Sequence, residues 1–493
     1  MWRNWIRNKK QQVPSRSWDL STPLLNLTRR DRWTIGDACQ GTQVFGSTGS
    51  GKSTGTVAAL CHAFLRAGFA GIFFTIKPED RRTYENYCRR AGREKDLIIF
   101  GINEPWRYNP IDAELQRKDA GAGLTENIVA LLSNLLEACE RNSGQGDGRD
   151  DSGYWKRTNR QLMRNTIDLL AMATGRLSIE DLYRVVVSAA SSPEQVRSPE
   201  WRASSFCFQC LRQADQPTLP KDKAHDLGVV ADFFLVEWPN LSEKTRSIVL
   251  STFTSMLDVL NRGSIRTLMG GETNITPEMA MDGKIILIDL PVKQFGEVGT
   301  FVQILWKFCF QRAMERRNIA ENPRPVFLVC DESHLLAVSS DQMFQTTARS
   351  SRVATVYATQ SISNYLAVFG EKAEAEVHSL LGCLQSQFFH QQSDIKTNQY
   401  AADLIGRTRQ FLVNSSQTMQ PSSLLEHWLG SGVPSTTSGI NETLEYEVQP
   451  GDFATLRQGG PPQWTTDAIV YQGGRTFSMT GRPWSPVSFR QQF

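Results

Sequence analysis

The stretch Gly46-Ser-Thr-Gly-Ser-Gly51-Lys52-Ser53 decides the fold that this sequence predicts. It fits the pattern G-x-x-x-x-G-K-[ST], in which glycines let backbone N–H groups approach phosphate oxygens. An apolar run, Thr42–Phe45, precedes it, and a helix-like stretch follows, as the pattern requires. We expect an ATP site in which Lys52 reaches the β and γ phosphates and the Ser53 hydroxyl binds Mg²⁺. The expected nucleotide-binding residues are Gly46, Ser47, Thr48, Gly49, Ser50, Gly51, Lys52, Ser53 and Thr54.

Short apolar runs alternate with helix-like stretches around this loop and again in the second half of the chain. The runs are Thr42–Gly46, Gly71–Ile76, Leu97–Phe100, Lys284–Leu290, Val326–Cys330, Val353–Thr359 and Leu384–Phe389. The helix candidates between them include Lys52–Ala67, Arg81–Ala91 and Thr300–Arg316. This alternation is typical of βαβ units. We therefore expect an α/β fold with a mainly parallel sheet to which both ends of the chain contribute.

The middle of the chain has the apolar periodicity of helices. Leu124–Cys139 and Tyr154–Met172 each place apolar residues on one face, and Ser178-x-x-Asp181 resembles a helix cap. We expect residues 1–40 to lead into the nucleotide-binding domain, 41–114 and 241–493 to form it, and 115–240 to be an inserted all-α domain. The polar tracts Arg141–Gly153 and Ser415–Gly439 are predicted loops.

Two adjacent carboxylates, Asp331 and Glu332, follow the apolar strand Val326–Cys330. Asp331 would hold Mg²⁺ through its water shell, and Glu332 would polarise the attacking water as general base. The alternative is that the strand ends in Asp for turn reasons alone. Asp289, at the end of another predicted strand, competes for the role but lacks a following Glu.

The predicted strand Val353–Thr359 ends at Gln360, which is positioned to sense the γ-phosphate from a neighbouring strand. Arg349 and Arg352 precede this strand, and we expect them near the carboxyl edge of the sheet. There, either could act as an arginine finger on a neighbouring subunit's nucleotide. Solvated arginines on a helix are the alternative.

Composition sets few limits on the partner. The 493 residues contain 54 Lys and Arg against 51 Asp and Glu, so any surface for nucleic acid must be a local patch. Nine scattered cysteines suit a reducing compartment, and Cys207 with Cys210 read as buried thiols rather than half a zinc site. No apolar run is long enough to span a membrane, so we expect a cytoplasmic protein. The basic N-terminus, with two Trp in its first ten residues, is a frayed tail or a peripheral anchor at the inner membrane.

With those residues in hand, the chain resembles the type IV coupling proteins of conjugation and type IV secretion, in the HerA/FtsK superfamily. The resemblance rests on the loop at Gly46–Ser53, on the Asp331-Glu332 pair, and on four shorter elements. These are Lys77 before Pro78, Tyr108-Asn109-Pro110, Trp155 in the helical middle, and Ala358-Thr359-Gln360. The chain lacks the Asn-Lys-x-Asp motif of GTPases and the Leu-Ser-Gly-Gly-Gln signature of ABC transporters.

The resemblance implies a RecA-like P-loop ATPase with ATP and Mg²⁺, an inserted all-α domain, and six subunits around a channel through which DNA moves. It favours Arg349, eleven residues before Gln360, as the finger, with Arg352 as a rival. A relaxase or other secretion substrate and secretion-channel ATPases are the implied partners. Two other functions stay open: a soluble HerA-like DNA translocase in repair or defence, and a secretion ATPase for protein cargo. In the inserted domain, Lys156, Arg157, Arg160 and Arg164 form either a phosphate-contacting face or a solvated helix face.

Overall fold

The computed structural model describes residues 18–119, 121–142, 152–216, 220–370, 374–420, 428 and 433–491. The chain divides into two compact units. The first comprises residues 1–43, 57–359 and 364–386, and the second comprises 44–56, 360–363 and 387–493. The N-terminal residues considered as a membrane anchor lie outside the described part of the chain.

The first unit is built on parallel strands. They are β4 (Ala70–Phe74), β5 (Leu97–Gly101), β6 (Ile285–Asp289), β7 (Val326–Cys330) and β8 (Val353–Thr359). They lie side by side in the order β8-β7-β4-β6-β5, and every adjacent pair is parallel. Because β4 and β5 precede the helical middle of the chain and the other three follow it, the prediction that distant segments share a parallel sheet is confirmed.

The strands of this unit are buried along nearly their whole length, because helices pack on them. The helices include α2 (Ala58–Ala67), α3 (Asp80–Arg90), α15 (Val292–Arg316) and α16 (Ser340–Ala348). Aromatic rings fill the space between α3 and the sheet: Phe73 stacks on Tyr84 with ring centroids 4.2 Å apart and meets Phe327 at 4.7 Å. Gly71 permits the close approach of β4 and β7, because a Cβ there would lie 2.2 Å from the Phe327 carbonyl oxygen. Three small elements precede β3 (Thr42–Phe45): a hairpin of β1 (Pro23–Asn26) and β2 (Arg32–Thr34), and α1 (Ile35–Ala38).

The middle of the chain is helical, as predicted. Its helices are α4 (Pro110–Gln116), α5 (Thr125–Asn142), α6 (Ser152–Thr174), α7 (Ile179–Ser188), α8 (Pro193–Arg197), α9 (Pro199–Ser204), α10 (Phe206–Ala214), α11 (Lys221–Asp232), α12 (Trp238–Asn240), α13 (Glu243–Leu260) and α14 (Gly263–Gly270). Ser178 caps α7 by accepting a hydrogen bond from the Asp181 amide, as its sequence pattern predicted. Helix α13 packs on α5, α6 and α7, so helical packing continues beyond residue 240.

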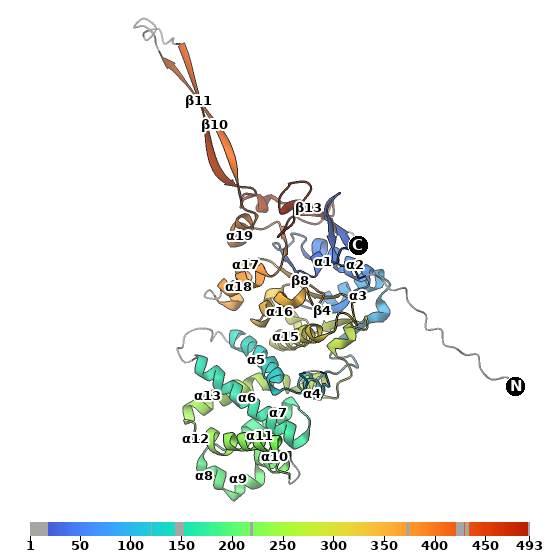
Figure 1. Ribbon diagram of the computed structural model, residues 1–493, viewed down its shortest axis with the longest axis vertical. Coiled ribbons are helices and arrows are strands. Elements are labelled where there is room, and N and C mark those ends of the chain that lie inside the picture. The colour runs from blue at the N-terminus through green and yellow to red at the C-terminus, as the bar shows by residue number, and fades with distance from the viewer. Residues whose placement is uncertain are drawn as a thin grey trace, which may run out of the picture. The chain divides into compact units, whose positions relative to one another are not determined.

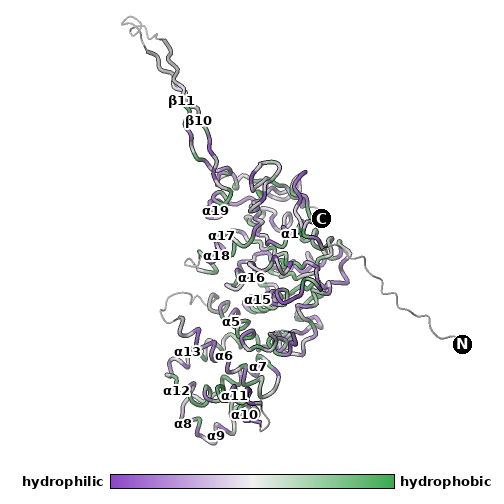
Figure 2. The backbone as a smooth tube through the Cα atoms, in the orientation of Figure 1, coloured by the Kyte–Doolittle hydropathy of each residue, from purple (hydrophilic) through white to green (hydrophobic). Residues whose placement is uncertain are grey.

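None of the helices in the described residues is long and apolar enough to cross a membrane. Hydrophilic residues interrupt the hydrophobic ones along the helices (Figure 2). The predicted loop at 141–153 falls mostly outside the described residues, and its two ends continue α5 and begin α6.

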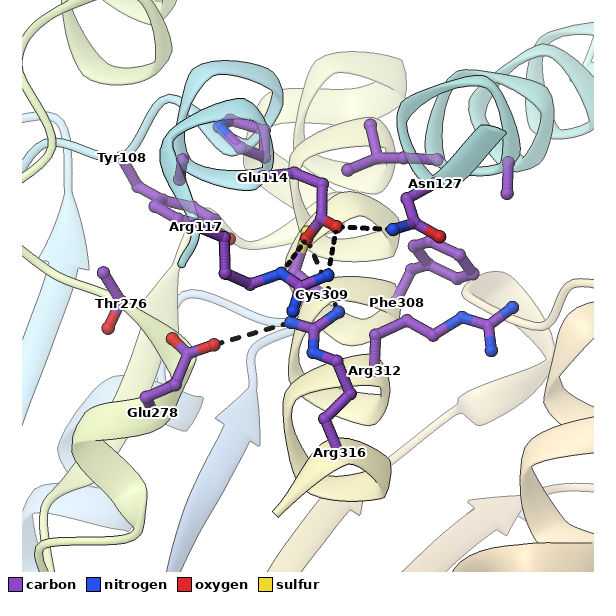
Figure 3. A pocket seen from close by; sticks show the side chains of 14 residues that line it. Tyr108, Glu114, Arg117, Asn127, Thr276, Glu278, Phe308, Cys309, Arg312 and Arg316 are labelled. Atoms are coloured by element: carbon purple, nitrogen blue, oxygen red, sulfur yellow. Dashed lines mark hydrogen bonds and ion pairs between the residues drawn. The ribbon is translucent and has the colours of Figure 1, made fainter. Parts of the chain in front are cut away.

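A cavity of about 320 Å³ marks the joint between α4, α5 and α15 (Figure 3). Glu114 on α4 stands at its centre and accepts hydrogen bonds from Arg117 at 2.8 Å and from Asn127 at 2.8 Å. Arg316, in the last turn of α15, lies 3.4 Å from Glu114 and 3.6 Å from Glu278. These pairs tie α4, at the start of the helical middle of the chain, to α15, and the arginines at the cavity are offset by carboxylates.

The second unit contains a long two-stranded ribbon, β10 (Arg407–Gln420) with β11 (Val433–Tyr446) (Figure 1). It also contains α19 (Ile395–Ile405) and the antiparallel pair β12 (Thr465–Gln472) with β13 (Trp484–Arg490). The prediction of a loop at Ser415–Gly439 was therefore wrong for 415–420 and 433–439, which are strand. Its Ser- and Thr-rich composition misled that prediction, because an exposed two-sided ribbon has no buried face to impose an apolar alternation.

Candidate functional site

The phosphate-binding loop follows β3 (Thr42–Phe45), and the residues after it begin a helix through a π turn at Ser53–Val57 and then α2. Gly49 and Gly51 have φ of 81° and 88°, in the left-handed region that favours glycine. A Cβ on Gly49 would meet no atom within 4 Å, so the loop is open at this point. A Cβ on Gly46 would instead lie 2.4 Å from the Ser50 Oγ. The loop thus has the glycine-dependent backbone that a phosphate cradle requires, and Ser53 stands at its helix start.

Two side chains from other elements of the second unit, His390 and Thr466, form hydrogen bonds with this loop or with the turn that follows it. His390, the last residue of β9 (Ser386–His390), hydrogen-bonds Thr56 at 2.7 Å and Thr466 at 3.2 Å. The Thr466 hydroxyl also donates to the Ser50 carbonyl oxygen at 2.5 Å. Burial lowers the pKa of His390 from its ordinary 6.5 to about 3, so the ring is neutral.

The end of the chain also meets the loop. The Gln491 amide donates to the Thr54 hydroxyl and accepts from the Gly460 backbone N–H. No local signal in the sequence could have identified Thr466 or Gln491, because each lies more than 400 residues from the loop residue that it contacts. Such contacts appear only when the chain is folded.

Gln360 shares the second unit with the phosphate-binding loop. The Gln392 side chain joins the two: its Oε1 accepts from the Ser47 hydroxyl at 3.4 Å, and its Nε2 donates to the Gln360 carbonyl oxygen. The sequence analysis missed Gln392. The rule that identified Gln360, a polar residue just after a predicted strand, could have found it, since Gln392 follows β9 by two residues.

Asp331 and Glu332 lie in the first unit at the carboxyl end of β7. Glu332 has a left-handed backbone, φ 48° and ψ 45°, which is uncommon outside glycine and is often found at functional sites. Its Oε2 lies 3.8 Å from the His334 Nδ1, which hydrogen-bonds the Thr359 hydroxyl at 2.9 Å. The Ser333 hydroxyl donates to the Ala358 carbonyl oxygen at 3.1 Å, so the ends of β7 and β8 are joined by a hydrogen bond.

Asp289, the competing carboxylate at the end of β6, forms an ion pair with an arginine. Its Oδ2 accepts from the Arg81 Nη1 at 2.7 Å, and Arg81 also contacts Glu85 and Glu104. These partners raise the pKa of the Arg81 guanidinium, although its partial burial opposes the rise. Asp289 is thus part of an ion-pair network.

The expected place of the two arginines was wrong. Arg349 directly follows α16 and Arg352 immediately precedes β8, so both lie at the amino-terminal end of that strand rather than at its carboxyl end. The reason is simple: residues that precede a strand enter the sheet at the edge opposite to residues that follow it. Arg349 is exposed, whereas Arg352 donates to the carbonyl oxygens of Trp18 at 2.9 Å and Pro323 at 3.0 Å.

Two further expectations concern the helical region. Cys207 and Cys210 are buried thiols in α10, and burial raises the pKa of Cys210 to about 11. Among the described residues, no group of His, Cys, Asp or Glu is arranged to hold a metal ion. Of the basic residues on α6, Arg164 pairs with Glu126 and Arg160 contacts Ser133 at 3.4 Å, while Arg157 is exposed.

Comparison with known proteins identifies one matching family model and solved structures with a similar fold. Residues 325–445 match a family model described as the TraM recognition site of TraD and TraG. The structure is similar to that of the bacterial conjugative coupling protein TrwB, with a TM-score of 0.60 and 17% sequence identity, over 94% of this chain and 87% of that one. TrwB in complex with a GTP analogue matches with a TM-score of 0.61 and 17% identity, over 94% and 88% of the two chains. TrwB in complex with ADP and Mg²⁺ matches with a TM-score of 0.59 and 17% identity, over 93% and 87%. No curated protein sequence matches this chain. At this identity the likeness shows the fold alone, which is the fold of TrwB.

Proposed function

We propose that this chain is an ATPase of the coupling-protein type, which uses ATP and Mg²⁺ to deliver DNA or nucleoprotein to a conjugation or type IV secretion channel. The observation that carries the proposal is the phosphate-binding loop, whose positive-φ glycines and helix start suit a nucleoside triphosphate. TrwB, which shares the fold, has been crystallised with ADP and Mg²⁺.

The residues divide the chemistry as follows. The Lys52 ammonium and the loop N–H groups would offset charge on the β and γ phosphates, and Ser53 and Asp331 would hold Mg²⁺. Glu332 would orient and deprotonate the attacking water. Gln360, at the end of the strand next to Asp331, would respond to loss of the γ-phosphate.

The proposed assembly is a homo-hexamer with a central channel for DNA, in which Arg349 of one subunit completes the site of the next. The region 325–445 would bind a protein partner, because the matching family model is named for recognition of TraM. A relaxase or another secretion substrate and the ATPases of the channel are the remaining proposed partners. The protein would work in the cytoplasm, at the inner membrane where such channels open.

ATPase assays with and without single- and double-stranded DNA test the proposal. The wild-type chain should hydrolyse ATP and be stimulated by DNA, while Lys52→Ala should fold normally and lose hydrolysis, because Lys52 supplies the phosphate counter-charge. Unchanged turnover in Lys52→Ala would refute the assignment of the loop. ATP hydrolysis that ignores DNA but responds to a secreted protein would favour the cargo ATPase instead.

A further inference from the structure

Gln392 is a buried side chain whose hydrogen-bonding capacity is used by several segments. Only 3% of its surface is exposed. Besides the Ser47 hydroxyl, its Oε1 accepts the backbone N–H groups of Ser393 and Asp394, both at 2.9 Å. Its Nε2 donates to the Gln360 carbonyl oxygen. Because two backbone donors point at Oε1 and a carbonyl oxygen receives Nε2, this network fixes the orientation of the amide.

The backbone around Gln392 adds to these contacts. The Ser47 N–H donates to the Gln391 carbonyl oxygen at 2.9 Å, so the loop after β9 holds the phosphate-binding loop through both main chain and side chain. The Asn398 amide donates to the Gln392 carbonyl oxygen at 3.2 Å. Asn398 lies on α19, so Gln392 contacts both the phosphate-binding loop and this helix.

The start of α19 is tied to the segment that follows Gln360. Asp394 caps the helix by accepting the Thr397 N–H at 2.9 Å, and its other oxygen accepts the Ser363 hydroxyl at 2.8 Å. The Thr397 hydroxyl accepts the Ile362 N–H at 2.9 Å. Any movement of the Gln360 strand end is therefore resisted, or transmitted, at the first turn of α19.

The far end of α19 anchors the β10–β11 ribbon. The Tyr446 hydroxyl accepts from Gln399 at 2.7 Å and donates to Asp403 at 2.8 Å. Arg407, the first residue of β10, donates to the same hydroxyl at 2.7 Å and lies over the Tyr446 ring at 4.3 Å. Hydrogen bonds from Gln399, at 2.9 Å, and from Tyr446 lower the pKa of the Asp403 carboxyl. A continuous set of hydrogen bonds thus runs from Ser47 to the base of the ribbon.

We propose that Gln392 is a positioning residue that links nucleotide occupancy of the phosphate-binding loop to α19 and the base of the β10–β11 ribbon. The inference rests on the proposed function, since it requires that the loop bind a nucleotide. Phosphate binding draws backbone N–H groups of the loop toward the anion. Ser47 lies in that loop, and its N–H and hydroxyl are bonded to Gln391 and Gln392, so a shift of the loop pulls on the segment after β9. Gln392 is the side chain through which that shift reaches both the Gln360 strand end and the cap of α19.

Hydrogen–deuterium exchange of the full chain tests the proposal, with ADP plus Mg²⁺ and a non-hydrolysable ATP analogue as probes. In the parent protein, the two nucleotides should give different exchange rates for residues 395–405. In Gln392→Leu this difference should vanish and kcat should fall about tenfold or more, as expected when a buried hydrogen-bonding side chain is lost. The Kd for ADP should stay within about threefold of the parent value, since Gln392 does not itself contact phosphate.

Two companion variants sharpen the result. Gln392→Glu keeps the acceptor for the Ser393 and Asp394 amides but loses the donor to Gln360, so it should retain the folded state and still lose the exchange difference. Gln410→Leu makes the same change as Gln392→Leu at an exposed ribbon position and should leave the exchange response and kcat unchanged. If Gln392→Leu proves unstable, Gln392→Glu carries the test.

The proposal is overturned if the parent binds both nucleotides yet residues 395–405 exchange alike in both. It is equally overturned if the folded Gln392→Glu protein keeps the difference. A parent chain that binds neither nucleotide would instead refute the proposed function, which the binding measurement records separately.

Discussion

His390 is a buried residue that supports the phosphate-binding loop through hydrogen bonds to two threonines. It is fully buried, it bridges Thr56 and Thr466, and its pKa is held near 3 mainly because burial disfavours the charged ring. A protonated ring would also face the positive charge of Lys52. The neutral imidazole can act as donor on one nitrogen and acceptor on the other, which is what two threonine hydroxyls require.

This geometry predicts a pH dependence of stability. Below about pH 6.5 the unfolded chain binds a proton at His390, while the folded chain does not until about pH 3, so acid favours unfolding over that window. As the pH is lowered through this window, the free energy of unfolding should therefore decrease by up to about 1.4 kcal/mol per pH unit because of this group. Urea titrations at pH 7 and pH 5 measure it.

The matched comparison is His390→Gln, which keeps an amide donor and acceptor but cannot titrate. It should be less stable than the parent at pH 7 and lose less stability on going to pH 5. Equal losses in the two proteins would show that the histidine does not titrate in the unfolded chain alone.

Glu332 differs from Asp331 in what its substitution should do. Glu332→Gln keeps the size of the side chain but removes the proposed base, so ATP should bind with nearly the parent Kd while hydrolysis drops by about 10²-fold or more. Filter binding and a single-turnover assay separate the two effects. Loss of ATP binding in this variant would mean that the base has been misassigned, and Asp331→Asn, expected to weaken Mg²⁺ binding, serves as the contrasting control.

At the scale of elements, a buried ion pair fixes α16 on α15. Lys307 is 1% exposed and pairs with Asp341, which is 0% exposed. Asp341 also accepts from Gln311 at 2.9 Å, from the Val338 N–H at 3.0 Å and from the Tyr357 hydroxyl at 3.3 Å. Every oxygen of the carboxylate is satisfied, which offsets the cost of removing it from water.

Removing one partner of this pair should be costly. Lys307→Met leaves the Asp341 carboxylate buried without its counter-charge, and the free energy of unfolding should fall by about 3 to 5 kcal/mol. The double variant Lys307→Met with Asp341→Leu should recover much of that loss, because no isolated charge remains. Chemical denaturation of the four proteins in the cycle measures the coupling. A double variant as unstable as the single one would point to lost packing rather than an unpaired charge.

The elements themselves could be predicted from the sequence because buried strands of a parallel sheet read as continuous apolar runs, and Val326–Cys330 is one in both sequence and structure. The ribbon could not be predicted. Where their burial is described, its residues are largely exposed, so no buried face imposes an apolar alternation, and Ser415–Gly439 has the composition of a loop. Gln360 was predicted as a site residue from its position after a strand, and that role stays a prediction. Thr466 and Gln491 were not, because their role is set by contacts across hundreds of residues.

At the scale of the whole molecule, the two arginines near β8 now have distinguishable roles. Arg352 is partly buried and its guanidinium serves two backbone carbonyl oxygens, those of Trp18 and Pro323. Its side chain therefore stabilises the fold of its own chain. Arg349, exposed at the end of α16, is the arginine of the two whose side chain is presented to solvent.

A finger that acts between subunits should make turnover depend on assembly, so turnover per chain should rise with protein concentration. Arg349→Ala should bind ATP almost normally and lose roughly 10³-fold in turnover, whereas Arg352→Ala should mainly lower the melting temperature. Mixing Arg349→Ala with Lys52→Ala should restore activity, because an intact loop from one chain then meets an intact arginine from another. Neither variant can supply both parts of one site, so recovery in the mixture can arise only between chains. Parent-level turnover of Arg349→Ala in assembled particles would exclude Arg349 as the finger and leave the γ-phosphate to another residue of the neighbouring subunit.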